Sequence, residues 1–154
     1  MARGAHGYTI VELIVVMVLI GLLTAVAMPR ILGSNVMAGT AWRQQVVSAL
    51  RYAQKSAVSH RRLVCGNVSA QSVTLTIAPL PGSACASNLP SPDGSSYSTS
   101  DSQAVASGAL GNIFFQSDGR ITSDANGTTP LAAATIAIAG EQSIRIDGVT
   151  GHVE

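Results

Sequence analysis

The chain has 154 residues, of which 47% are hydrophobic and only 11% are charged, and its formal net charge is +1. So few charges exclude a disordered polyelectrolyte and are atypical of a freely soluble enzyme, in which roughly a quarter of the residues are charged. The composition therefore predicts one domain with a hydrophobic core, in a protein that is anchored, exported or assembled.

The charges are unevenly distributed along the chain. Residues 13–92 contain no acid and six bases, whereas residues 93–154 contain seven acids and two bases. Such a division can hold the two halves of one molecule together, can hold one molecule to the next, or can simply keep both surfaces solvated.

The first predicted element is an apolar helix near the N-terminus. Residues 10–28 carry a single charge, Glu12, and a helix of this length spans about 28 Å, close to the roughly 30 Å of a bilayer core. Residues 13–23 lack the periodic polar positions of a soluble helix. The pattern predicts a transmembrane segment over residues 8–29. Glu12 is then either a buried charge with a partner or a first-turn residue favoured by the helix dipole.

The start of this segment resembles a known processing motif. Gly7, Tyr8 and Glu12, followed by the unbroken apolar run, are similar to the cleavage and methylation motif of type IV pilins and type II secretion pseudopilins, with Tyr8 in place of the usual Phe. The resemblance implies that residues 1–7 are a leader, removed by a prepilin peptidase between Gly7 and Tyr8, and that Tyr8 is then N-methylated. It also implies that Glu12 neutralises the Tyr8 ammonium group of a neighbouring subunit. Pro29 lies where many family members have a helix-kinking proline.

An ordinary secretory signal peptide is the alternative for the same segment. Ala25, Val26 and Ala27 form an A-x-A triplet after an apolar stretch, and cleavage there would release a soluble protein that begins at Met28.

An amphipathic continuation of the helix is predicted over residues 30–60. Its apolar positions recur on one helical face: Leu32, Val36, Val46, Leu50, Ala53 and Ala57. Gly33 and Gly39 weaken its middle, and Pro29 is expected to kink it. A separate helix that starts at Ser34 is the alternative. Three bases lie largely off the apolar face and form a candidate basic face: Arg43, Arg51 and Lys55.

The remainder, residues 61–154, is predicted to be a globular β domain. Alternation of apolar and polar residues predicts a hairpin over 62–68 and 72–79, and further strands at 112–116, 131–139, 142–147 and 150–154. A turn is expected at 117–120 and a long Ser-, Gly- and Pro-rich loop over 81–108. The fold class is therefore α+β, a long N-terminal helix packed on antiparallel sheet. This order of elements, with residues 49–58 and 144–153, resembles the H-type minor pseudopilins and the related FimT-type minor pilins.

The two cysteines are the remaining residues that could take part in covalent chemistry. Cys65 and Cys85 can form a disulfide if the domain lies outside the cytoplasmic membrane; two reduced buried thiols are the alternative. The sequence has no tight metal-ligand spacing, no catalytic motif and no cofactor-binding motif, so we expect no metal, no cofactor and no enzyme activity.

Together the resemblances imply a non-catalytic minor subunit of a type IV pilus or a type II secretion pseudopilus, assembled near the filament tip. It would cross the cytoplasmic (inner) membrane once, with its globular domain in the periplasm or on the cell exterior. Its partners would be other pilins or pseudopilins, the prepilin peptidase and the inner-membrane assembly platform. The alternative is a minor pilin that binds DNA during natural transformation, through the candidate basic face with Arg61 and Arg62. Of the C-terminal Gly-Arg-x-Arg of such pilins, the chain has Gly119 and Arg120 but lacks the second arginine.

Overall fold

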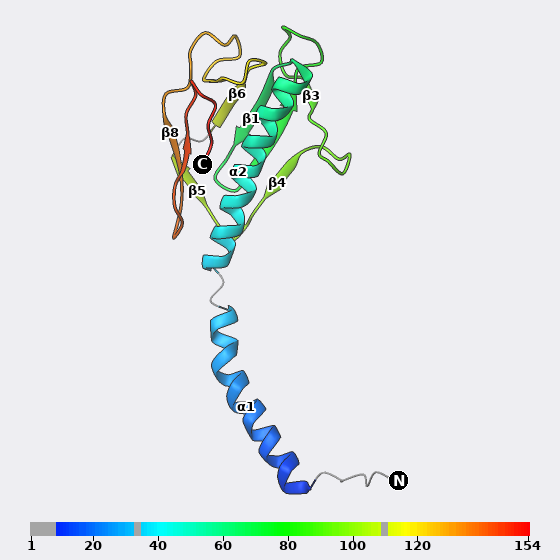
Figure 1. The fold of residues 1–154 in the computed structure, drawn as a ribbon, viewed down its shortest axis with the longest axis vertical. Helices are drawn as coiled ribbons and strands as arrows, with labels where there is room; N and C mark the ends of the chain where they lie inside the picture. The colour runs from blue at the N-terminus through cyan, green and yellow to red at the C-terminus, as the bar shows by residue number, and fades with distance from the viewer. Residues whose placement is uncertain (1–8, 33–34, 109–110) are drawn as a thin grey trace, which may run out of the picture. The chain divides into compact units, whose positions relative to one another are not determined.

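The computed structural model describes residues 9–32, 35–108 and 111–154, and the side chains of residues 9–25, 37–108 and 111–154. The chain divides into two compact units, residues 1–34 and residues 35–154. Figure 1 shows both units, with labels on the helices and on several of the strands. Gly7 and Tyr8 lie outside the described residues, so the predicted cleavage site has no structural counterpart here.

The first unit consists of helix α1, Ile10–Leu32. Its start is capped by Thr9, whose Oγ1 accepts a hydrogen bond from the Glu12 N–H at 3.3 Å. Thr9 and Glu12 are three residues apart, which is the spacing of a capping box. The cap explains why the helix begins at this point, directly before the apolar run.

The structure contains two helices in the region where the sequence predicted one continuous helix. Helix α1 extends past Pro29 to Leu32, and helix α2 covers Asn35–His60. The start of α2 is close to the alternative start at Ser34, and its end agrees with the prediction. The predicted kink at Pro29 concerns a side chain outside the described set and stays a prediction.

Helix α2 presents one apolar face to the core of the second unit. Its buried side chains are Trp42, Val46, Val47, Ala49, Leu50, Ala53 and Ala57. The predicted face is thus confirmed for the described part of α2, and Trp42 is added to it. Near the start of α2, a Cβ at Gly39 would lie 3.3 Å from the Ala139 carbonyl oxygen, so glycine permits a close approach of this helix to the β domain.

Two antiparallel sheets make up the β domain. The strands are β1 Val64–Val68, β2 Ser72–Ile77, β3 Ser87–Asn88, β4 Ser98–Ser100, β5 Ala106–Gly108, β6 Gly111–Phe115, β7 Ile121–Thr122, β8 Ala134–Ile138 and β9 Ile144–Ile146. The larger sheet has the order β3-β2-β1-β6-β7, with β4 also paired to β2, and the smaller sheet has the order β5-β8-β9. Helix α2 packs on β1, β2 and β6 (Figure 1). The α+β fold and the β1–β2 hairpin predicted from the sequence are confirmed.

Two predictions for the β domain were wrong in detail. The stretch 81–108 is not a plain loop, because it contains β3, β4 and β5. These strands are short and pair through backbone groups, so their Ser-rich sequence shows no alternation. In place of the predicted strand over 150–154, the chain ends a turn at Thr150 and then forms one bridge, between Ile146 and Val153.

Candidate functional site

The apolar surface of α1 is the most unusual feature of the first unit. Every described side chain from residue 9 to residue 25 is exposed. The large apolar ones are Ile10, Val11, Leu13, Ile14, Val15, Val16, Met17, Val18, Leu19, Ile20, Leu22 and Leu23. A helix that is apolar on all sides is stable only when other apolar material surrounds it. Such a surface is expected to be covered by other apolar material.

A membrane span is one way to cover this surface. Among the described residues, no helix is both long enough and apolar enough to cross a membrane. The transmembrane segment predicted over residues 8–29 thus stays a prediction.

Glu12 lies in the first turn of α1 and is exposed. Its backbone N–H is satisfied by Thr9, and its carboxylate lies near the positive end of the helix dipole, where an acid is favoured. Both interpretations from the sequence, a first-turn residue and an assembly charge, are compatible with this position.

The candidate basic face is largely engaged within the domain. The Arg43 Nε donates to the Gln142 carbonyl oxygen at 2.7 Å. Arg51 donates from Nε and Nη2 to the Val153 carbonyl oxygen at 3.0 and 2.8 Å. Lys55 is exposed, and its ammonium group makes no interaction with the described residues. The two arginines therefore bind α2 to the segments on either side of β9. Of the three bases, only Lys55 has no partner among the described residues.

Among the residues that the structure describes, no salt bridge joins the acidic half to the basic half. Within the described residues both ion pairs join groups of the second half, Arg120 with Asp118 at 2.7 Å and His152 with Glu154 at 3.5 Å. The interpretation that opposite charges hold the two halves of one molecule together therefore finds no ion pair to support it there.

The aspartates of the second half stabilise turns. Five of them accept backbone N–H groups in their own turns: Asp93, Asp101, Asp118, Asp124 and Asp147. The Ser95 hydroxyl group holds the pKa of Asp93 below its usual value. The Arg120 side chain does so for the pKa of Asp118, and backbone N–H groups do so for the pKa of Asp124 and Asp147.

Cys65 and Cys85 form the disulfide that the sequence allowed, with their Cα atoms 6.2 Å apart. Cys65 lies in β1, and Cys85 lies just before β3. The bond therefore fixes the segment between β2 and β3 against the centre of the larger sheet.

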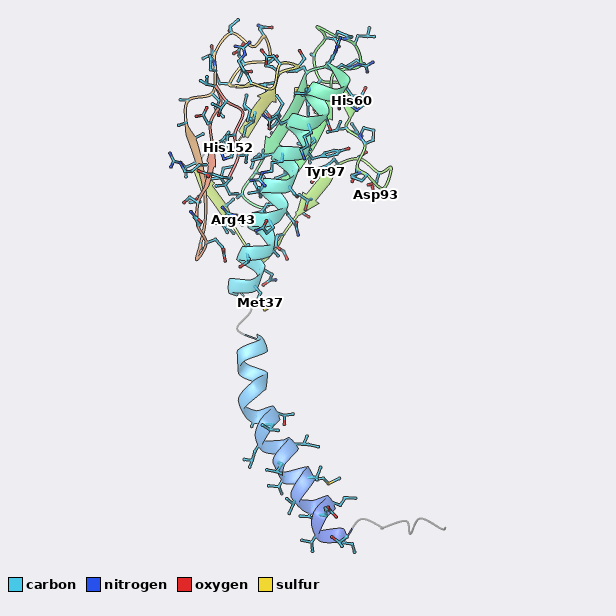
Figure 2. The ribbon with its side chains drawn as sticks, in the orientation of Figure 1. Met37, Arg43, His60, Asp93, Tyr97 and His152 are labelled. Atoms are coloured by element: carbon cyan, nitrogen blue, oxygen red, sulfur yellow. A yellow bond between two sulfur atoms is a disulfide. The ribbon has the colours of Figure 1, made fainter. Side chains whose placement is uncertain are left out.

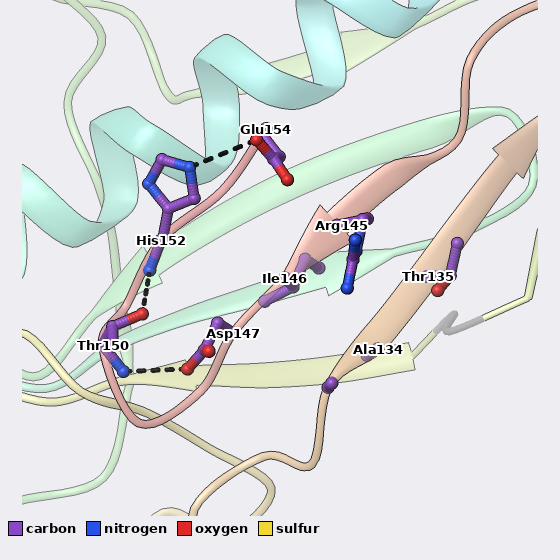
Figure 3. A pocket seen from close by; sticks show the side chains of 9 residues that line it. Ala134, Thr135, Arg145, Ile146, Asp147, Thr150, His152 and Glu154 are labelled. Carbon is purple, nitrogen blue, oxygen red and sulfur yellow. Dashed lines mark hydrogen bonds and ion pairs between the residues drawn. The ribbon is translucent and has the colours of Figure 1, made fainter.

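A cavity beside β8 and β9 has a volume of about 550 Å³. Figure 3 shows its charged lining residues, among them Arg145, Asp147, His152 and Glu154. Asp147 accepts the Thr150 N–H at 2.9 Å, so its carboxylate is already used in a turn. No group of three metal-binding side chains occurs among the described residues. The described lining of the cavity therefore contains the His152–Glu154 ion pair and no group that could hold a metal ion.

Sequence reasoning missed the contacts made by Thr9, Arg43 and Arg51. The capping spacing from Thr9 to Glu12 is visible in the sequence and could have identified the first of these. The arginine contacts join residues about a hundred positions apart, so no local pattern predicts them.

Comparisons with known proteins agree with this motif and fold. Residues 2–28 match the family described as the prokaryotic N-terminal methylation motif. Two crystal structures of the type IV minor pilin FimU from Pseudomonas aeruginosa, strain PAO1, have similar folds. Each has a TM-score of 0.50 and 18% identity over 77% of this chain, and the match covers 89% and 84% of the respective FimU chains. No curated protein matches the sequence.

Proposed function

We propose that this minor pilin-like chain is a non-catalytic subunit of a type IV pilus or a type II secretion pseudopilus. The observation that carries the proposal is the methylation motif over residues 2–28, joined to a domain with the fold of a minor pilin. In this proposal a prepilin peptidase removes residues 1–7, and the new N-terminus at Tyr8 is methylated.

The proposed anchor is the apolar segment that includes α1. Its exposed side chains cannot remain in water, because each large apolar residue left in water forgoes about 1.5–3 kcal/mol of burial free energy. Before assembly the cytoplasmic membrane would cover them, and after assembly the equivalent helices of neighbouring subunits would do so. The globular domain would then lie in the periplasm or on the cell exterior, where the Cys65–Cys85 disulfide is stable.

The proposed assembly contact joins the Tyr8 ammonium group of one subunit to the Glu12 carboxylate of the next. A charge pair in an apolar environment is strongly coupled, because removal of one partner leaves the other unpaired. Such a contact would select subunits that carry the complementary charge and would set their axial register near the tip.

The experiment separates the charge of Glu12 from its place in the helix cap. Glu12→Gln keeps a side chain suited to the capping box but removes the charge. Thr9→Ala removes the capping hydroxyl group but keeps the charge. In cells we expect Glu12→Gln to insert in the membrane yet to lose crosslinking to neighbouring subunits, whereas Thr9→Ala crosslinks at nearly the native level. If both variants lose crosslinking equally, Glu12 acts through the cap and the proposed charge pair is wrong.

Processing has an independent test. Gly7→Val places a β-branched side chain at the cleavage junction, and mass spectrometry of the membrane fraction should then find the seven leader residues still attached. Native cleavage of this variant would contradict the role of the prepilin peptidase.

A further inference from the structure

A polar cleft lies at the C-terminal end of α2, which His60 marks in Figure 2. It has a volume of about 420 Å³. One wall comes from the end of the helix, with Arg61 and Arg62, and another from the segment 81–84. The rest of the lining consists of Leu63, Gln116, Ser117, Ala125 and Asn126. Its lining residues belong neither to the methylation motif nor to the cavity beside β8 and β9.

Arg61 occupies a backbone position that normally belongs to glycine. Its φ angle is +52°, and it is the only described non-glycine residue with a positive φ. The Arg61 N–H donates to the Val58 carbonyl oxygen at 3.3 Å, and the Arg62 N–H donates to the Ala57 carbonyl oxygen at 3.1 Å. These two bonds form a Schellman motif, in which the left-handed residue is usually glycine because a side chain there is strained. Arg61 therefore places a cationic side chain at a strained backbone position, and residues of this kind are often found at functional sites.

The two arginines of the cleft carry unneutralised charge. Neither forms an ion pair within the part of the chain that the structure describes. The nearby turns contain two acids, but Asp118 binds Arg120 and Asp124 binds the N–H groups of Thr128 and Thr129. This contrasts with Arg43 and Arg51, which donate to carbonyl oxygens of their own domain.

The walls opposite the arginines are fixed by other contacts. The disulfide holds Cys85, directly after the segment 81–84, against β1. Ser83 closes the turn in this segment, because its Oγ accepts the Leu80 N–H at 3.1 Å. The Gln116 amide group donates to the Thr122 Oγ1 at 2.8 Å. Arg61 and Arg62 therefore line a cleft whose other sides are held in place by hydrogen bonds and by the disulfide.

We propose that this cleft binds a phosphate-type oxyanion through Arg61 and Arg62. A phosphate monoester or inorganic phosphate carries up to two negative charges, which two guanidinium groups neutralise with paired N–H···O hydrogen bonds. The site is compact and does not continue as a basic track, since Arg43 and Arg51 are engaged elsewhere. That geometry suits a single phosphoryl group and does not suit a long polyanion, which requires a row of free cations.

The test uses the full chain in a non-ionic detergent, with calorimetric titration at constant ionic strength. The probes are inorganic phosphate for the free anion and glycerol 3-phosphate for an esterified phosphoryl group, and whichever binds more tightly identifies the source. Acetate is the control anion. We expect Arg62→Gln to weaken phosphate binding about tenfold, whereas the matched control Lys55→Gln binds as the native chain does. Trp42, the single tryptophan, is buried and reports by fluorescence that each variant is folded.

Arg61→Gly provides the sharper variant. Glycine relieves the strained φ, so the thermal midpoint without phosphate should rise by about 3 °C, while phosphate binding weakens to the same degree as in Arg62→Gln. Higher stability with native phosphate binding would show that the guanidinium group of Arg61 has no role, and would overturn the proposal. Equal binding of acetate and phosphate would overturn it as well, as would tight binding of duplex DNA that is lost in Arg62→Gln, because the cleft would then hold a long polyanion.

Discussion

Helices α1 and α2 have similar lengths, 23 and 26 residues, but their apolar side chains have opposite environments. In α2 most of the described apolar residues lie on one face and are buried in the domain core, whereas Met37 and Val58 are exposed. In α1 the described apolar side chains are exposed on all sides. The difference indicates that the domain is stabilised from within, whereas α1 depends on what surrounds it.

One matched pair of substitutions tests this comparison most strongly. Leu50 in α2 is 0% exposed and Leu19 in α1 is 53% exposed. We expect Leu50→Ala to lower the free energy of unfolding of the domain by about 3 kcal/mol, through lost burial and the cavity left behind. Leu19→Ala should change it by less than about 0.5 kcal/mol. Urea unfolding of the full chain in detergent, followed by Trp42 fluorescence, measures both. Equal losses would show that α1 contributes to the domain core.

The disulfide gives the next largest effect. Its sequence separation of 20 residues predicts roughly 3 kcal/mol of stabilisation from restricted freedom of the unfolded chain. We expect a Cys65→Ser, Cys85→Ser variant to unfold at a correspondingly lower urea concentration. Membrane insertion should be unaffected, because the bond lies wholly within the β domain. A variant with native stability would contradict this role.

The arginine contacts of α2 predict a smaller effect. Arg51→Gln removes a paired hydrogen bond to the Val153 carbonyl oxygen and should cost about 1 kcal/mol. Lys55→Gln, four residues away on the same helix, should be neutral within about 0.5 kcal/mol. The comparison of urea midpoints decides whether these bases serve the fold or a partner, and equal midpoints for the two variants would rule out the structural role of Arg51.

The smallest predicted effect is a dependence on pH. The folded pKa of Asp147 is lowered, chiefly by the Thr150 N–H. Its contribution to stability is therefore present above the unfolded pKa of about 3.9 and is lost as the pH falls through the lower folded value. Asp147→Asn should remove part of the acid sensitivity of the thermal midpoint, and the curves of the two proteins should converge below pH 3. Parallel curves from pH 6 to pH 2 would exclude this contribution.

The sequence predicted the features that leave a periodic or motif-based pattern. The apolar face of α2, the β1–β2 hairpin, the end of α2 at His60 and the pairing of Cys65 with Cys85 belong to this group. These features depend on local spacing or on a single compatible partner.

Other features depend on partners that are distant in sequence. Strands β3 and β4 form because the outer edge of β2 offers backbone hydrogen-bonding groups, which accept a Ser-rich segment as readily as an apolar one. The positive φ of Arg61 follows from the Schellman motif at the end of α2. The sequence has no glycine at this position, so it did not indicate a left-handed residue there. For the same reason the cleft with Arg61 and Arg62 became visible only when the segments around it were brought together.

The pairing around β2 has a consequence for solubility. The β3 strand covers Thr76 and Ile77, β4 covers Ser72, Val73 and Thr74, and the intervening Leu75 N–H donates to the Tyr97 carbonyl oxygen. An uncovered strand of this length is a template for edge-to-edge aggregation, especially where many copies are concentrated at one place. The segment 87–100 therefore protects the edge of β2 from pairing with another chain. Its low-complexity sequence suggests that it is dispensable, yet its deletion would expose the unpaired backbone groups of β2 to other chains.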